Sequence, residues 1–331
     1  MILITGGLGF IGSHIALRAL AQGKEVILVD NLVNSNLHVL ERLQYVSGQY
    51  IPFAQIDVRN TPALNKFIEQ YPIDVVIHCA GFKSLQESEL KPIEYYNNNL
   101  SALMSLIRVM QRIGTRTLLH LSSLAVYGHS ASDLAESTPF NYQSTNPYIR
   151  SQQMMEQILF DVSNSDHEWN IVNLRLGNVA GAYERGILGE YIPKLPKSIL
   201  GLAMQAANRE REVIELFSQA DTEDGTVERS FVHVLDVCDA VDKSLQWQQE
   251  HSHLYTAFNI CQNKRTSIAE LIKQVERVTA TEIETIEQIG VFQPLSQIGA
   301  SVELAQQHLN WSANRTIDQI VQDQWLYYHG P

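Results

Sequence analysis

The sequence predicts an α/β protein whose first part is a doubly wound, parallel sheet. Two observations predict this fold class. Short apolar runs alternate with helical stretches through the first half of the 331-residue chain, as expected of a parallel sheet that helices cover on both faces. A glycine-rich turn also joins the first apolar run to the first helix. Crossovers between parallel strands are right-handed, so this alternation places helices on both faces of the sheet and gives a doubly wound fold.

Six strands are expected in this part of the chain. They cover residues 1–4, 26–29, 55–58, 74–80, 117–122 and 171–175, with helical stretches around 36–46, 61–70, 93–113 and 147–163. The second half is less regular, because Gly, Pro, Asn and Asp cluster over 177–230. There we expect helices near 191–206, 235–249 and 267–279, and strands at 230–234 and 255–260.

This organisation predicts two domains. The first covers 1–176 and also receives a returning segment near 230–250. The second is a smaller, partly discontinuous α/β domain over 177–331. We expect it at the carboxyl edge of the sheet, where the ligands of such folds gather. A hydrophobic content of 45% suffices for a substantial core.

The opening turn has the residues of a dinucleotide-binding site. The segment Thr5-Gly6-Gly7-Leu8-Gly9-Phe10-Ile11-Gly12 directly follows the first apolar run. Gly6 permits a tight turn, Gly9 lets the backbone approach a pyrophosphate, and Gly12 lets the helix pack on the strand. The N–H groups at the helix start would face the phosphates. An ordinary strand-to-helix turn is the alternative interpretation.

Asp30 strengthens the dinucleotide interpretation and selects the cofactor. It ends the second apolar run at about the spacing expected of a ribose-binding carboxylate. A carboxylate there accepts hydrogen bonds from the adenosine ribose and repels a 2′-phosphate. Residues 31–35 contain no Arg or Lys that could hold such a phosphate. The sequence therefore favours a Rossmann domain that binds NAD rather than NADP.

Composition excludes several classes of function. A formal net charge of −12 argues against a nucleic-acid partner and an anionic membrane surface. No apolar stretch is long enough to cross a bilayer. The three cysteines and eleven histidines lack metal-ligand spacing, so we expect no metal. With the first strand beginning at Met1 and the cysteines read as reduced, we expect a cytoplasmic protein.

Two residues are candidates for proton transfer. Ser123 directly follows the fifth expected strand, and Tyr148 lies in the first turn of the helix at 147–163. A phenol can take the proton of an alcohol that loses a hydride, while a serine hydroxyl holds the same oxygen. A core tyrosine and a helix-capping serine are the alternative interpretation, and the residues alone leave both open.

Several motifs in order along the chain carry a resemblance to a known family. They lie at 5–14, 29–35, 78–83, 91–99, 122–128, 147–148, 178, 222–225 and 229–236. With them, the chain resembles the extended short-chain dehydrogenases/reductases, and among these the UDP-glucose (UDP-galactose) 4-epimerases. The likeness implies that NAD stays bound, takes a hydride from C4 of the sugar and returns it to the other face. It also implies a homodimer paired through the helices at 93–113 and 147–163.

The resemblance also implies roles for individual residues. Ser123, Tyr148 and the residue at 152 would form the catalytic set. The nucleotide sugar, most simply a UDP-sugar, would contact Lys83, Ser123, Tyr148, Asn178 and Arg229. The cofactor would contact Gly6, Gly9, Phe10, Ile11, Gly12, Asp30, Asn31, Asn34, Ser35, Asp57, Val58, Ala80, Gly81, Lys83, Asn98, Tyr148 and Gln152.

Three departures from the family pattern concern the reaction centre and the substrate. Gln152 replaces the lysine of Tyr-x-x-x-Lys, which would lower the tyrosine pKa; Arg150 is at the wrong helical spacing to replace it. The stretch 288–295 lacks the arginine and aspartate usual before the last helix, and 187–190 contains Glu190 but no asparagine.

The departures leave two main interpretations. One is an NAD-dependent nucleotide-sugar 4-epimerase, or a close derivative, with impaired turnover or an altered substrate. The other is a catalytically inactive NAD-binding homologue that acts as a binding or regulatory protein. A sugar-nucleotide dehydratase ranks below both, because Leu124-Ala125 stands where such enzymes carry an acid pair.

Overall fold

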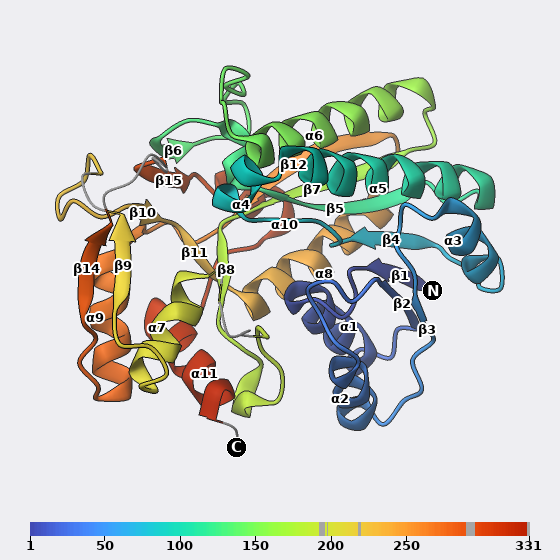
Figure 1. Ribbon diagram of the computed structural model, residues 1–331. Coiled ribbons are helices and arrows are strands. Elements are labelled where there is room, and N and C mark those ends of the chain that lie inside the picture. The colour runs from blue at the N-terminus through green and yellow to red at the C-terminus, as the bar shows by residue number, and fades with distance from the viewer. Residues whose placement is uncertain (192–195, 197, 218–219, 289–294, 330–331) are drawn as a thin grey trace. The chain divides into compact units, whose positions relative to one another are not determined.

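The structure is a computed structural model that describes residues 1–191, 196, 198–217, 220–288 and 295–329 (Figure 1). The chain forms two compact units. The first unit comprises Met1–Val126, Tyr142–Arg175 and Cys238–Phe258; the second comprises Tyr127–Asn141, Leu176–Val237 and Asn259–Pro331.

A seven-stranded sheet forms the centre of the first unit, in the order β12-β7-β5-β4-β1-β2-β3. Strand β1 pairs in parallel with β2 and β4, β2 with β3, and β4 with β5. Because the strand order reverses beside β1, the predicted doubly wound fold class is confirmed. The strands are β1 (Ile2–Thr5), β2 (Val26–Asp30), β3 (Phe53–Gln55), β4 (Val75–His78), β5 (Thr117–Ser123), β7 (Asn170–Leu176) and β12 (Leu254–Ile260).

Helices cover the sheet, and two of them, α5 and α6, lie side by side (Figure 1). Asn146 caps α6 by accepting hydrogen bonds from two backbone N–H groups, and Pro147 occupies its first turn. Gly114 ends α5 with a left-handed backbone. The helices are α1 (Phe10–Ala21), α2 (Leu37–Ser47), α3 (Thr61–Ile68), α4 (Leu85–Leu90), α5 (Pro92–Ile113), α6 (Pro147–Ser165) and α8 (Val234–Glu250).

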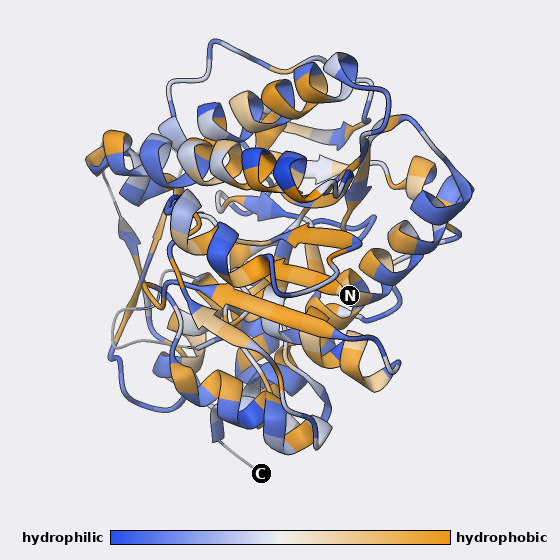
Figure 2. Cartoon of the chain, turned by 90° about the vertical axis from the view of Figure 1, so that its right-hand side faces the viewer, coloured by the Kyte–Doolittle hydropathy of each residue, from blue (hydrophilic) through white to orange (hydrophobic). Residues whose placement is uncertain are grey.

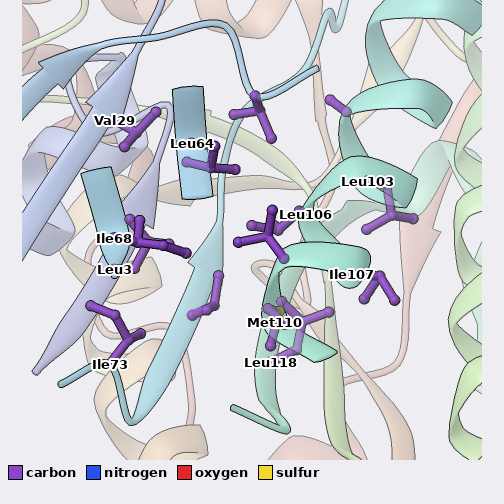
Figure 3. Close-up of a cluster of buried hydrophobic side chains, with 14 of the residues drawn as sticks. Leu3, Val29, Leu64, Ile68, Ile73, Leu103, Leu106, Ile107, Met110 and Leu118 are labelled. Atoms are coloured by element: carbon purple, nitrogen blue, oxygen red, sulfur yellow. The ribbon is translucent and has the colours of Figure 1, made fainter. Parts of the chain in front are cut away.

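The core of the first unit lies between the sheet and helices α3, α5 and α6. Leu3, Val29 and Leu118 of the strands pack against Leu64 and Leu106 of the helices (Figure 3). The strands of the sheet are largely apolar (Figure 2), as expected for strands covered on both faces. Within the described residues, no helix is long and apolar enough to cross a membrane.

The prediction for the third strand was wrong at its end. We expected strand over 55–58, but β3 stops at Gln55. The Ile56 N–H still bonds to the Asp30 carbonyl, and the chain then turns, with the Asn60 N–H bonding to the Asp57 carbonyl. Side-chain hydrogen bonds of Asp57 fix this turn, and they do not follow from apolar periodicity.

The second unit contains several small sheets. The largest has the order β13-β10-β15-β6, and β11-β8 and β14-β9 form pairs. The core of the second unit lies among α7, α9 and α11. A capping box of Ser267 and Glu270 begins α9. The elements are β6 (Ala131–Leu134), β8 (Asn178–Ala180), α7 (Ile199–Ala207), β9 (Ile214–Phe217), β10 (Glu228–Arg229), β11 (Phe231–His233), β13 (Thr266–Ser267), α9 (Ile268–Thr279), β14 (Thr285–Gln288), β15 (Gln297–Ala300), α10 (Glu303–Leu309) and α11 (Ile317–His329).

Candidate active site

A pocket lies at the carboxyl ends of β1, β2, β3 and β4, where the strand order reverses. Ligands of doubly wound folds bind at this position. The pocket is lined by Gly6, Gly9, Asp30, Asn31, Asn34, Ser35, Ile56, Asp57, Val58, Cys79, Ala80, Gly81, Phe82, Asn98 and Ala102.

The glycine turn has no room for side chains. Gly6 has a left-handed backbone with φ +66°, and a Cβ there would lie 2.8 Å from the Ala80 nitrogen. A Cβ on Gly12 would lie 2.3 Å from the Gly6 carbonyl oxygen. No side chain caps the start of α1 at Gly9. The turn therefore presents backbone and an uncapped helix N-terminus to the pocket, which suits a pyrophosphate.

Asp30 is buried and held in place from both sides. Its Oδ1 accepts hydrogen bonds from the Leu32 N–H (2.9 Å) and the Ser35 hydroxyl (2.8 Å). Its Oδ2 accepts one from the Leu8 N–H (3.0 Å). The carboxylate is thus pre-oriented at the pocket. One of its roughly four lone-pair sites stays open for a ribose hydroxyl.

Most of the residues expected at the cofactor lie in the pocket lining. The exceptions are Phe10, Ile11 and Gly12, which form the first turn of α1, and Lys83, Tyr148 and Gln152. Sequence reasoning missed four lining residues. Ile56, Cys79 and Phe82 adjoin expected positions, whereas Ala102 gave no signal.

Ser123 and Tyr148 lie together in the first unit. Tyr148 is 7% exposed. Burial raises the pKa of its phenol, and the nearby Ser123 side chain opposes that rise only in part. The pair has the arrangement needed at an alcohol oxygen. The tyrosine, however, is a weaker acid than in water.

Gln152 lies one helical turn beyond Tyr148 on the buried face of α6. It is 5% exposed, and its Oε1 has no hydrogen-bond partner among the described residues. Arg150 does not replace the missing charge, because its Nε donates to the Ser144 carbonyl (2.6 Å). A buried amide with an open oxygen suggests that this end of the site is completed by a ligand or water.

Two buried polar groups fix α6 against its surroundings. Asn99 of α5 binds both the Phe82 backbone (N–H to Oδ1, 2.8 Å) and the Ser151 hydroxyl (3.1 Å). Glu156 accepts hydrogen bonds from Ser122 (2.6 Å) and from the Arg175 guanidinium (2.7 Å to Oε2). These contacts join the pocket wall, β5 and β7 to the helix that carries Tyr148.

In the second unit, Arg229 is a buried cation. It is 7% exposed, and its Nη1 donates to the Glu228 carbonyl (2.7 Å). No carboxylate among the described residues forms an ion pair with it, and burial lowers its pKa to about 10. Asn178, also expected at the substrate, lies exposed on β8 in register with Phe231. A buried guanidinium without a counter-charge favours an anionic ligand.

The other two departures from the family pattern lie at Glu190, which the structure describes, and at 288–295, most of which it does not. Glu190 accepts a hydrogen bond from the Ser198 hydroxyl (2.8 Å), so this carboxylate has a polar partner. Residues 289–294, where the arginine and aspartate of the family pattern are missing, lie outside the described residues.

Comparisons with known proteins agree with this geometry. The chain is 33% identical to UDP-glucose 4-epimerase 2 of Arabidopsis thaliana over 98% of its length and 93% of that protein. It is 32% identical to UDP-glucose 4-epimerase of Neisseria meningitidis, covering 98% and 96%. The solved UDP-glucose 4-epimerase of Bifidobacterium longum, in complex with NAD+ and UDP, matches with a TM-score of 0.94 and 32% identity, covering 99% and 98%.

A second solved structure, UDP-glucose-4-epimerase from Stenotrophomonas maltophila, matches with a TM-score of 0.93 and 29% identity, covering 99% and 97%, and holds NAD. The expected cofactor, NAD, is thereby confirmed. Residues 2–261 match the model of a single family. By this match and by its similarity to these relatives, the chain belongs to the NAD dependent epimerase/dehydratase family.

Proposed function

We propose that this protein is an NAD-dependent 4-epimerase of UDP-sugars, of the UDP-glucose/UDP-galactose type, with slowed proton transfer. The neighbouring side chains of Ser123 and Tyr148 carry this proposal. A phenol and a serine hydroxyl on one oxygen serve the removal and return of a proton at a sugar alcohol. The curated relatives at 32–33% identity, which are UDP-glucose 4-epimerases, supply the substrate class.

Each residue has a definite task in this proposal. Bound NAD would supply the hydride acceptor and donor. Tyr148 takes the proton of the 4-hydroxyl and later returns it, while Ser123 holds the same oxygen. Gln152 would accept a hydrogen bond from a cofactor ribose hydroxyl through its open Oε1 but brings no charge. The glycine turn and Asp30 hold the adenosine half.

Arg229 and Asn178 would bind the diphosphate of the substrate. The buried guanidinium of Arg229 has no carboxylate partner among the described residues, so an anionic group would compensate its desolvation. Asn178 offers an exposed amide from β8.

A second candidate function is an inactive NAD-binding protein. Gln152 and the raised pKa of Tyr148 favour it, because neither provides an ionised base near neutral pH. The protein would then bind NAD and respond to its state without turning over a sugar.

One experiment separates the two functions. Purified protein is mixed with UDP-galactose or UDP-glucose, and two signals are followed: the absorbance of reduced nicotinamide, and interconversion of the sugars by chromatography. Slow interconversion that is lost in Tyr148→Phe supports the epimerase. Bound nicotinamide that is indifferent to every sugar nucleotide supports the binding protein.

The proposal includes a cytoplasmic homodimer. Helices α5 and α6 pack together and carry the exposed apolar residues Ile93, Met104, Met154 and Phe160. Exposed apolar residues on two adjacent helices suit a twofold interface. Sedimentation of the wild-type protein beside Met104→Glu tests the dimer: the variant should sediment as a monomer.

A further inference from the structure

Strands β8 and β11 form a two-stranded parallel pair that carries or adjoins both residues proposed for the substrate diphosphate. Asn178 begins β8, and its backbone N–H bonds to the Ser230 carbonyl (2.9 Å). Arg229 directly precedes Ser230. Each strand has three residues, and a two-stranded pair is marginally stable by itself. The placement of Asn178 and Arg229 therefore depends on what holds the other end of the pair.

His233, the last residue of β11, lies at that other end, in register with Ala180 of β8. Its ring is fully buried, and Nδ1 accepts a hydrogen bond from the Leu235 N–H (3.0 Å). The ring proton is therefore on Nε2, which donates to Oδ2 of Asp323 (3.1 Å). Because Asp323 belongs to α11, this hydrogen bond joins the end of β11 to that helix.

The segment that follows β8 packs closely on the same two elements. A Cβ on Gly181 would lie 2.7 Å from the His233 Nε2, and one on Gly189 would lie 2.4 Å from the Tyr327 ring of α11. The backbone after β8 thus lies directly against His233 and α11. Since such close packing leaves no slack, a shift of α11 would displace this segment and the end of β8 with it.

We infer that His233 and Asp323 are positioning residues of the substrate site. Through their hydrogen bond, α11 fixes the β8–β11 pair and holds Asn178 and Arg229 in place for the diphosphate of a nucleotide sugar. This inference rests on the proposed function, which takes those two residues as the diphosphate-binding groups. The hydrogen bond should control affinity for the substrate and leave cofactor binding unchanged, because the cofactor pocket is lined by residues of the first unit.

The test is calorimetric measurement of the dissociation constant of UDP with NAD-loaded protein. Asp323→Leu has no acceptor for the His233 Nε2 proton. It should weaken UDP binding by roughly tenfold or more, since misplacing a functional group by about 1 Å can cost up to about a hundredfold. Asp323→Asn keeps an amide oxygen as acceptor and should stay within about threefold of wild type. The affinity for NAD should be the same in all three proteins.

Asp318→Leu is the matched control. Asp318 lies on the same helix, but it binds Gln274 and Arg277 of α9. The substitution loosens α11 on its other side and leaves the contact with His233 intact. Its affinity for UDP should therefore equal that of wild type.

His233→Asn breaks the same hydrogen bond from β11 and keeps the inference testable if Asp323→Leu does not fold. An asparagine can accept the Leu235 N–H two residues on, as in an Asx turn, but its side chain is too short to reach Asp323. This variant should weaken UDP binding as much as Asp323→Leu does, and the double variant should be no weaker than either single one.

The outcomes separate the inference from the proposed function. UDP binding that is unchanged in folded Asp323→Leu and His233→Asn would overturn the positioning role. Equal weakening by Asp318→Leu would also overturn it, because any loosening of α11 would then suffice. Failure of wild-type protein to bind UDP would instead overturn the proposed substrate site, and the inference with it.

Discussion

Restoring a lysine at position 152 should accelerate sugar turnover. Tyr148 and Gln152 are one helical turn apart on the buried face of α6, a spacing that brings side chains to about 5–6 Å. At about 6 Å and an effective dielectric of about 20, a unit charge changes the free energy of phenol ionisation by about 3 kcal/mol. This corresponds to about two pKa units.

The full effect will not be realised, because position 152 is 5% exposed and an ammonium group there also loses hydration. A buried lysine has a lowered pKa of its own. We therefore expect Gln152→Lys to raise turnover by about tenfold rather than a hundredfold. Because the lysine must be protonated to act, the gain should shrink as the pH rises toward the lowered pKa of that lysine.

The assay is interconversion of UDP-galactose and UDP-glucose with saturating NAD. Gln157→Lys is the matched control, since it places the same charge on an exposed position of the same helix; it should leave the rate unchanged. A second readout does not need turnover: ultraviolet titration of phenolate, with Tyr148→Phe identifying the signal of Tyr148. A variant that titrates like wild type and is no faster would refute the reasoning.

Three further predictions concern other parts of the first unit. Asp30→Ser should weaken NAD binding by roughly tenfold and relax the exclusion of NADP; calorimetry with both dinucleotides measures this, and continued exclusion of NADP would contradict it. In folded protein, burial lowers the pKa of His78 to about 3 and that of His120 to about 4, from 6.5. The unfolded chain therefore binds more protons, and stability is lost as the pH falls through this range. His120→Phe should reduce the loss between about pH 7 and pH 5 by about 2 kcal/mol, and unchanged urea midpoints relative to wild type at both pH values would count against it. Glu156→Gln leaves Arg175 buried without its partner and should cost about 3–5 kcal/mol of unfolding free energy. Glu69→Gln, which breaks an exposed pair, should cost less than about 1 kcal/mol; equal costs would contradict the argument.

Local signals explain why so much of the first unit could be predicted. Gly6, Gly12 and Asp30 act through backbone conformation and spacing, and both can be predicted from residue type and position in the sequence. The buried parallel strands can be predicted in the same way, because each is an apolar run. The helices α4, α10 and α11 were not predicted, because short amphipathic helices depend on tertiary packing. In α11, that packing involves the core with α7 and α9.

Hydrogen bonds between side chains could not be predicted from the sequence, for a different reason. Asp57 was expected at the cofactor, and it does line the pocket. Its hydrogen bonds to Arg59 form in the turn that follows the end of β3 at Gln55. An Asp-Val-Arg sequence in a continuing strand would point Asp57 and Arg59 to the same face without this turn. The backbone geometry therefore determines which groups bind the carboxylate.

The hydrogen-bond and ion-pair partners of the arginines near α6 limit where a positive charge beside Tyr148 can come from. Near the buried face of α6, the described residues include Arg150 on the helix and Arg175, which contacts it. Arg150 is turned to the Ser144 carbonyl, and Arg175 is held by Glu156 in a buried pair whose charges cancel. Neither can replace a lysine at position 152. If wild-type protein turns over a sugar nucleotide, we therefore expect the cation that favours phenolate to come with a ligand. The phenol of Tyr148 should then titrate at lower pH in protein loaded with oxidised NAD than in protein freed of it, a difference that Gln152→Lys should reduce.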